Sequence, residues 1–205
     1  IENVHDRNYV QKLLDLTLNN SEIRKIGFPL NKKLIDREMT IAGGTLECCL
    51  KALDNGISFN IAGGTHHAFS DRAEAFCLLN DQAIAAQHLI NKYKIRKILI
   101  IDLDVHQGNG TAEIFKKNKK VFTFSMHGKK NYPFQKTKSD LDIELLDGTE
   151  DQQYLNILNE KLNMIFDNIK PEFIFYLSGV DILKTDKLGR LNITIEGCKL
   201  RDEIV

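Results

Sequence analysis

The feature that most constrains the fold is an unbroken apolar run that ends in a polar, glycine-containing loop. Residues 97–101 are Lys-Ile-Leu-Ile-Ile, a run typical of a parallel strand whose two faces are both covered by helices. Residues 102–110 follow with carboxylates, an imidazole and two glycines. Because ligands bind at the carboxyl ends of strands in open α/β sheets, the run predicts a buried strand that leads into a functional loop.

The acidic and imidazole groups of this loop have a regular spacing. Asp102, Asp104 and His106 alternate with two apolar residues, so in an extended chain their side chains share one face. Two carboxylates held together without a cation are costly, and carboxylate oxygens with an imidazole nitrogen suit Zn²⁺ or a similar divalent ion. The spacing favours a metal site. From this segment alone, helix capping by the aspartates with a packed histidine stays an alternative.

A second polar segment follows a shorter expected strand at residues 57–62. Gly63 and Gly64 allow a tight turn, and His66 and His67 come directly after it. Vicinal histidines in an extended chain point apart, so they suit an acid and a base that flank one reacting group better than a shared metal. An exposed loop without function is the alternative for this pair.

The rest of the chain alternates strands with helices. The periodicity predicts helices at residues 7–18, 31–53, 80–93, 111–115 and 150–169, further strands at 121–125 and 173–177, and loops at 19–30 and 126–148. This order predicts one three-layer α/β/α domain with a mainly parallel sheet and its polar loops at one edge. Asp181 follows the last strand, so at that edge it can meet Asp104 and His106.

Composition argues against a nucleic-acid-binding, membrane or secreted protein. The 28 lysines and arginines balance 28 aspartates and glutamates, which gives no field to attract nucleic acid or an anionic membrane. No apolar run approaches the roughly 20 residues of a membrane-spanning helix, and the first residues are unlike a signal peptide. The four cysteines, at positions 48, 49, 77 and 198, form no CxxC motif. We expect a soluble, cytoplasmic protein with reduced thiols, and the sequence identifies no protein partner.

Four motifs together resemble those of the histone deacetylase superfamily, in order and in spacing. They are residues 63–68 (GGTHHA), 76–81 (FCLLND), 102–110 (DLDVHQGNG) and 178–181 (SGVD). Residues 107–110 and 186–191 are most similar to the class IV branch and its bacterial relatives. The resemblance spans nearly the whole chain. It implies the arginase/deacetylase fold and hydrolysis of an acylated lysine, or of a related acylated small amine, by a metal-activated water.

The resemblance also implies roles for individual residues. Asp104, His106 and Asp181 would hold Zn²⁺, with Fe²⁺ as the alternative ion. His67 would be the general base and Asn109 would orient it. The remaining implied residues are His66, buttressed by Asp102, for charge stabilisation and amine protonation; Gly64, Phe76, Tyr132 and Gly179 for substrate binding; and Asp102, Asp104, His106, Ser125 and Met126 for a structural K⁺ ion.

Two departures from family patterns bear on the number of metal ions and on the completeness of the domain. A binuclear arginase-type site needs an aspartate two residues beyond the histidine, where this chain has Gly108, so a single metal is favoured. The family's oxyanion-stabilising tyrosine lies in a later glycine-rich loop, whereas this sequence ends at residue 205. We therefore expect a fragment of the domain, incomplete at both ends and poorly active alone.

A second class of function stays open at this stage. A non-catalytic module that binds acyl-lysine or an acyl-polyamine would keep the metal and the tunnel without the tyrosine. The neutral net charge does not favour histone tails over small acylated amines as the ligand.

Overall fold

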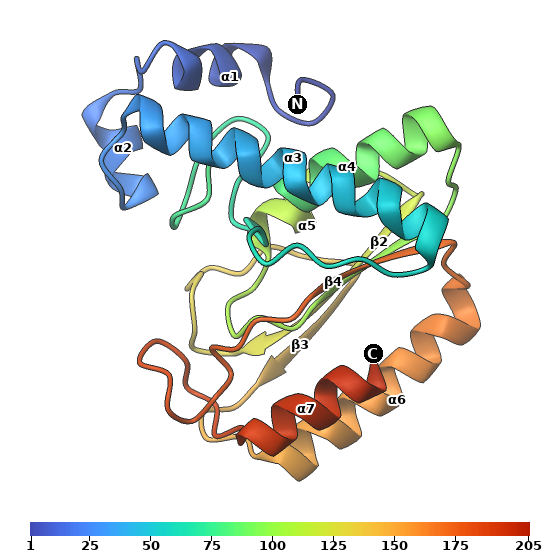
Figure 1. Ribbon diagram of the computed structural model, residues 1–205. Helices are drawn as coiled ribbons and strands as arrows, with labels where there is room; N and C mark the ends of the chain where they lie inside the picture. Colours follow the sequence, from blue (N-terminus) through green and yellow to red (C-terminus); the bar gives the residue numbers. More distant parts are fainter. The chain divides into compact units, whose positions relative to one another are not determined.

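The computed structural model describes residues 1–205, and the chain divides into two compact units. The first unit comprises residues 1–94 and 109–114, and the second comprises residues 95–108 and 115–205. Figure 1 traces the chain through both. None of the helices is long and apolar enough to cross a membrane. All four cysteines are free, as the sequence predicted.

The first unit is helical. Its elements are α1 (Arg7–Leu14), α2 (Asn20–Ile26), α3 (Lys32–Asn55), α4 (Asp81–His88), the π-helical turn η1 (Leu89–Tyr93) and the first six residues of α5 (Asn109–Phe115). Side-chain oxygens of Asp6, Asn31 and Asn80 accept backbone N–H groups at three helix starts, which fixes where those helices begin. Leucines and isoleucines of α1, α2 and α3 form an apolar core with residues 78, 79 and 84.

Two predictions fail in this unit. Residues 19–30 are not a continuous loop, because Asn19 and Glu22 form a capping box that starts α2, and Gly27 ends it in the left-handed conformation. Residues 57–62 are not a strand: they pair with no strand of the sheet, and the side chains of Ile57 and Phe59 are 66% and 81% exposed. Alternating apolar residues make a strand only where a neighbouring strand takes up the backbone hydrogen bonds.

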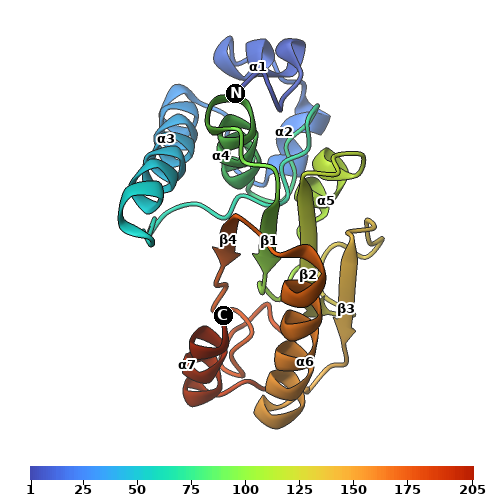
Figure 2. The same ribbon diagram turned by 90° about the vertical axis from the view of Figure 1, so that its right-hand side faces the viewer.

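The second unit is built on a parallel sheet. Its strands are β1 (Ile98–Asp102), β2 (Val121–Gly128), β3 (Leu141–Leu145) and β4 (Phe173–Leu177), in the order β3-β2-β1-β4 with every pair parallel. Figure 2 shows the four strands side by side. All five residues of the central strand β1 are buried, as its apolar run predicted.

Two helices accompany this sheet. They are α6 (Asp151–Ile169) and α7 (Ile195–Ile204), which pack together and run side by side in Figures 1 and 2. Tyr154, Leu158, Leu162 and Ile165 of α6 enter one apolar core with side chains of the sheet. The long loop predicted at residues 126–148 is wrong in part, because β2 continues through Gly128 and β3 lies within the segment.

A buried histidine ties the start of the chain into the first unit. The Nδ1–H group of His5 donates to the carbonyl of Phe69 at 2.9 Å, and the backbone N–H of Asn80 donates to Nε2 at 3.0 Å. This arrangement requires the neutral imidazole. Burial lowers the pKa of His5 from 6.5 to about 4, with the hydrogen bonds to the Phe69 and Ser70 carbonyls opposing the shift.

We expect the folded state to lose stability in mild acid. Because the pKa of His5 is lower in the folded than in the unfolded chain, the unfolded chain binds more protons between pH 6.5 and about 4. The stabilisation is complete above pH 6.5, and about 3 kcal/mol of it should be lost as the pH falls to about 4. Denaturant titration at several pH values measures it.

The matched variant is His5→Gln, which cannot titrate. It removes this contribution while leaving that of His127, whose pKa is also lowered to about 4 by burial. Parallel pH profiles for the wild type and His5→Gln would contradict the assignment.

Candidate metal centre and histidine pair

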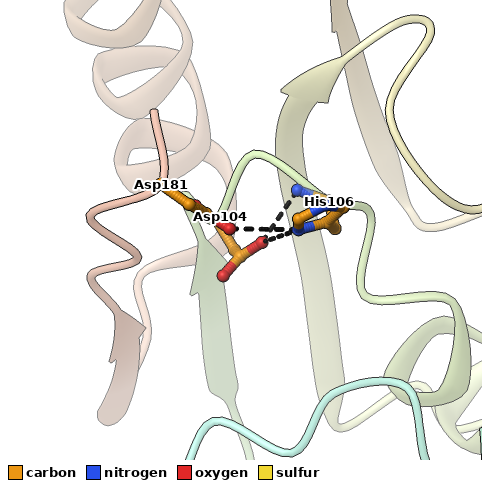
Figure 3. A group of neighbouring side chains, drawn as sticks. All are labelled: Asp104, His106 and Asp181. Carbon is orange, nitrogen blue, oxygen red and sulfur yellow. Dashed lines mark hydrogen bonds and ion pairs between the residues drawn. The ribbon is translucent and has the colours of Figure 1, made fainter. Parts of the chain in front are cut away.

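Three side chains of the second unit converge beyond the ends of β1 and β4. Nδ1 of His106 lies 3.0 Å from Oδ1 of Asp104 and 3.0 Å from Oδ2 of Asp181. Figure 3 shows the imidazole facing both carboxylates. The three ligand atoms all lie within 4.8 Å of one another. The structure therefore brings together the three residues that the sequence selected as metal ligands.

Local backbone structure sets this geometry. β1 ends at Asp102, and the chain then turns: the N–H of Asp104 donates to the Asp102 carboxylate at 3.2 Å, and the N–H of His106 donates to the Asp104 carboxylate at 2.8 Å. Leu103 and Val105 are fully buried in the core, as their alternation predicted. The shared face of the polar residues thus arises from a hydrogen-bonded turn, where the sequence had predicted continued strand.

A backbone hydrogen bond joins the two strand ends. The N–H of Val105 donates to Oδ1 of Asp181 at 3.0 Å, which leaves Oδ2 directed at His106. Gly179 lies against the other segment: a Cβ atom at this position would stand 2.7 Å from both Cα and Oδ2 of Asp104. A side chain there would push the two ligand segments apart, so the close approach requires glycine.

His106 and Asp181 shift each other's pKa. Burial lowers the pKa of His106. The hydrogen bonds to Asp104 and Asp181 and their negative charges raise it by more, so the pKa is raised from 6.5 to about 9. Burial, together with the charge of Asp104, raises the pKa of Asp181, although its bond to His106 acts in the opposite direction. Two carboxylates this close to the imidazole favour a positive charge between them.

The donor set fits a divalent ion. Ligand atoms of a tetrahedral site with bonds of about 2.1 Å lie about 3.4 Å apart, close to the 3.0 Å spacing found here. Two carboxylates and one neutral imidazole are ligands that zinc and ferrous iron accept. The side chains of Asp104, His106 and Asp181 are 18%, 17% and 21% exposed, so water and a substrate can reach them.

The residues of the implied potassium site belong to the same unit. Asp102 pairs with Ser125 in the register of β1 and β2, and Met126 follows Ser125 on β2. Asp104 and His106 come directly after the end of β1. Binding of K⁺ by this group stays a prediction.

The histidine pair lies in the first unit. Nδ1–H of His67 donates to Oδ1 of Asn109 at 2.7 Å, and Nδ2 of Asn109 lies 3.5 Å from a carboxylate oxygen of Glu74. Because the amide oxygen only accepts, the proton of neutral His67 sits on Nδ1, and the lone pair of the ring is on Nε2. The rings of His66 and His67 lie 4.1 Å apart, so the prediction that they diverge is wrong. The backbone turns here, with the N–H of His66 donating to the Gly64 carbonyl.

A buried carboxylate that the sequence did not single out holds the histidine loop. Asp81 accepts hydrogen bonds from the Thr45 hydroxyl at 2.6 Å, the Gly64 N–H at 3.1 Å and the Thr65 N–H at 2.9 Å. Gly63 has φ of +126°, and a Cβ atom there would stand 2.5 Å from the carboxylate. The loop that presents the histidines is thus fastened to the first residue of α4.

The other predicted site residues are distributed between the two units. Gly64 and Phe76 belong to the first unit, and the Phe76 ring packs on Phe28 with 53% of the residue exposed. Tyr132 and Gly179 belong to the second, where the Tyr132 carbonyl accepts the N–H of Gln107. Their roles in substrate binding, and support of His66 by Asp102, stay predictions.

Comparison with known proteins establishes the family. A family model described as the histone deacetylase domain matches residues 1–205. The chain is 43% identical over 205 residues to an uncharacterised protein of Picosynechococcus, covering all of this chain and 68% of the relative. It is 33% identical over 185 residues to histone deacetylase 2 of Arabidopsis thaliana, covering 89% of this chain and 46% of the relative. The chain belongs to the histone deacetylase family.

The fold agrees with that assignment. The crystal structure of a histone deacetylase homologue complexed with SAHA aligns with a TM-score of 0.87 at 25% identity, over 99% of this chain and 60% of the homologue. This likeness confirms the predicted three-layer α/β class with its parallel sheet. The chain spans only part of the length of these relatives.

The metal assignment predicts that Asp181→Ala abolishes stoichiometric metal binding, because it removes one of three ligands and one of the two carboxylates that contact His106. Metal content after dialysis against Zn²⁺ or Fe²⁺ measures it. Asp167→Ala, which removes an exposed carboxylate from α6, is the matched control and should leave the metal content unchanged. One bound ion per chain in Asp181→Ala would refute the assignment.

The role of Asp81 is tested by Asp81→Asn. One carboxylate oxygen becomes an NH₂ group that faces an N–H or O–H donor, so we expect a loss of about 1–3 kcal/mol in the free energy of unfolding. The imidazole NMR resonances of His66 and His67 should shift as the loop relaxes. Asp54→Asn, at an exposed position on α3, should change neither quantity. Unchanged imidazole resonances in Asp81→Asn would show that the carboxylate does not hold the loop.

Proposed function

We propose that this protein is a metal-dependent amidohydrolase that removes an acetyl or other acyl group from lysine or from a related amine. The observation that carries the proposal is the convergence of Asp104, His106 and Asp181 in a chain of the histone deacetylase family. Because the chain spans only part of its relatives, the activity of the whole protein is proposed from this site and the family together.

The three converging side chains would hold the metal. Zn²⁺ is proposed, with Fe²⁺ as the alternative, since both accept one imidazole nitrogen and two carboxylate oxygens. A bound ion of this kind polarises an acyl carbonyl and makes water a stronger nucleophile near neutral pH, which is the chemistry that amide hydrolysis needs.

The histidine pair would supply the proton transfers. Nδ1–H of His67 donates to Asn109, a tautomer that places the basic lone pair on Nε2, so we assign His67 as the group that takes the proton of the attacking water. Asn109 fixes the ring without adding a negative charge beside it. His66, which Asp102 would buttress, is assigned to the protonation of the departing amine.

The substrate contacts carry over from the resemblance. Phe76 and Tyr132 would form the aromatic walls of a tunnel for the acyl-lysine stem, and Gly64 and Gly179 would line it. The homologue that was crystallised with SAHA supports a site that accepts acylated amines or compounds that resemble them. Residues 1–205 would form one catalytic domain, with a structural K⁺ beside the strand ends.

The proposal is tested by hydrolysis of a fluorogenic acetyl-lysine peptide by the intact protein. We expect turnover, its loss on treatment with a chelator, and its recovery when Zn²⁺ or Fe²⁺ is restored. An absence of turnover with one metal bound per chain, on acetyl-lysine and on acylated polyamines, would contradict a hydrolase and leave a binding module.

The base assignment predicts that His67→Ala removes turnover while metal content stays at the wild-type value, because His67 is not a ligand. Loss of a general base typically lowers the rate by about 10²–10⁴-fold. His88→Ala, on α4, is the matched control and should keep activity. Metal loss in His67→Ala would mean that a ligand has been taken for a base.

A further inference from the structure

A buried arginine, Arg201, lies in α7 and is not one of the metal ligands assigned above. The Arg201 side chain is 1% exposed, and a guanidinium removed from water must be fully paired. Its Nε and Nη2 donate to Oδ1 of Asp202, both at 2.8 Å. The Tyr176 hydroxyl on β4 donates to the same oxygen at 2.5 Å. Asp202 thereby fixes the orientation of the guanidinium.

The remaining arm of the guanidinium reaches the metal-ligand segment. Nη1 of Arg201 donates to the carbonyl of Gly179 at 2.5 Å. Gly179 lies two residues before Asp181, and its Cα faces Asp104 so closely that a Cβ atom would clash with it. A charged hydrogen bond from α7 thus holds Gly179, which packs against the ligand Asp104 and precedes the ligand Asp181 in the chain.

We propose that Arg201 is a positioning residue for the metal centre. It holds the Gly179 carbonyl, and so keeps the segment that carries Asp181 against the segment that carries Asp104. The Val105 N–H fixes Asp181 itself, while Arg201 fixes the backbone before it. The inference rests on the metal centre proposed above and adds a second support from a helix that contributes no ligand.

The planar guanidinium suits this role because it binds two acceptors at once. Its fork meets Asp202 with two donors and still presents a third to Gly179. A lysine ammonium is a point charge on a flexible stem and lacks this fixed geometry. Arg201→Lys keeps the positive charge and loses the orientation, so it separates positioning from simple charge balance.

The test is metal affinity, measured on the intact metal-free protein by competition with a chromophoric Zn²⁺ chelator. We expect Arg201→Lys to bind Zn²⁺ about 10- to 100-fold more weakly, the range found when the support of a metal ligand is removed. Asp202→Asn keeps the arginine but weakens its anchor, and should lower affinity in the same direction by a smaller factor. If Arg201→Lys does not fold, the Zn²⁺ affinity of Asp202→Asn tests the positioning role instead.

The control for a merely structural role is Ile165→Ala on α6, which destabilises the apolar core of the second unit but removes neither a metal ligand nor a hydrogen bond to the Gly179 carbonyl. At a temperature where all variants are folded, it should keep the wild-type affinity despite a lower Tm. Wild-type affinity in folded Arg201→Lys and Asp202→Asn, or an equal affinity loss in Ile165→Ala, would overturn the inference. A wild-type protein that binds no metal would instead refute the metal centre on which it rests.

Discussion

The interaction on which the rest of this structure depends is the meeting of two carboxylates at the ends of neighbouring parallel strands. Asp104 and Asp181 both contact His106, and like charges this close together favour a cation between them. The two carboxylates raise the pKa of His106, and a divalent ion can take the place of its proton because the same nitrogen and oxygens face one another. Fold and chemistry therefore share one electrostatic requirement.

The surrounding structure fixes the irregular backbone segments that carry the polar residues of the site. Parallel pairing of β1 with β4 places both strand ends at one edge, Gly179 lets the backbones approach, and Arg201 secures the carbonyl behind them. In the first unit, Asp81 fastens the histidine loop in a comparable way. In both units a buried charged side chain stabilises backbone that has left regular secondary structure.

Much of this was predictable from the sequence because long apolar runs are unambiguous: β1, β4, α3 and α6 lie where periodicity placed them. The short elements were missed for particular reasons. The alternation of Leu141, Ile143 and Leu145 with acidic residues is a strand signal, but it is short and lies in a polar segment, and the capping pair that starts α2 lies among loop-forming residues.

Among the residues of the site, predictability depended on local spacing. Asp104 and His106 follow the buried strand β1 and Asp181 follows the parallel strand β4, so topology alone indicated that they meet. Asp81 and Arg201 gave no such signal, because each lies in a helix and holds backbone that is distant in the chain: the Thr65 N–H for Asp81 and the Gly179 carbonyl for Arg201. Burial and three-dimensional contacts were needed to identify them.

The most direct measurement of the central claim is anomalous X-ray scattering from crystals of the intact protein grown with Zn²⁺, recorded on both sides of the zinc absorption edge. The account predicts one strong peak within bonding distance of Nδ1 of His106 and of carboxylate oxygens of Asp104 and Asp181. A metal bound elsewhere, or no anomalous peak between these three side chains in a folded crystal, would contradict it.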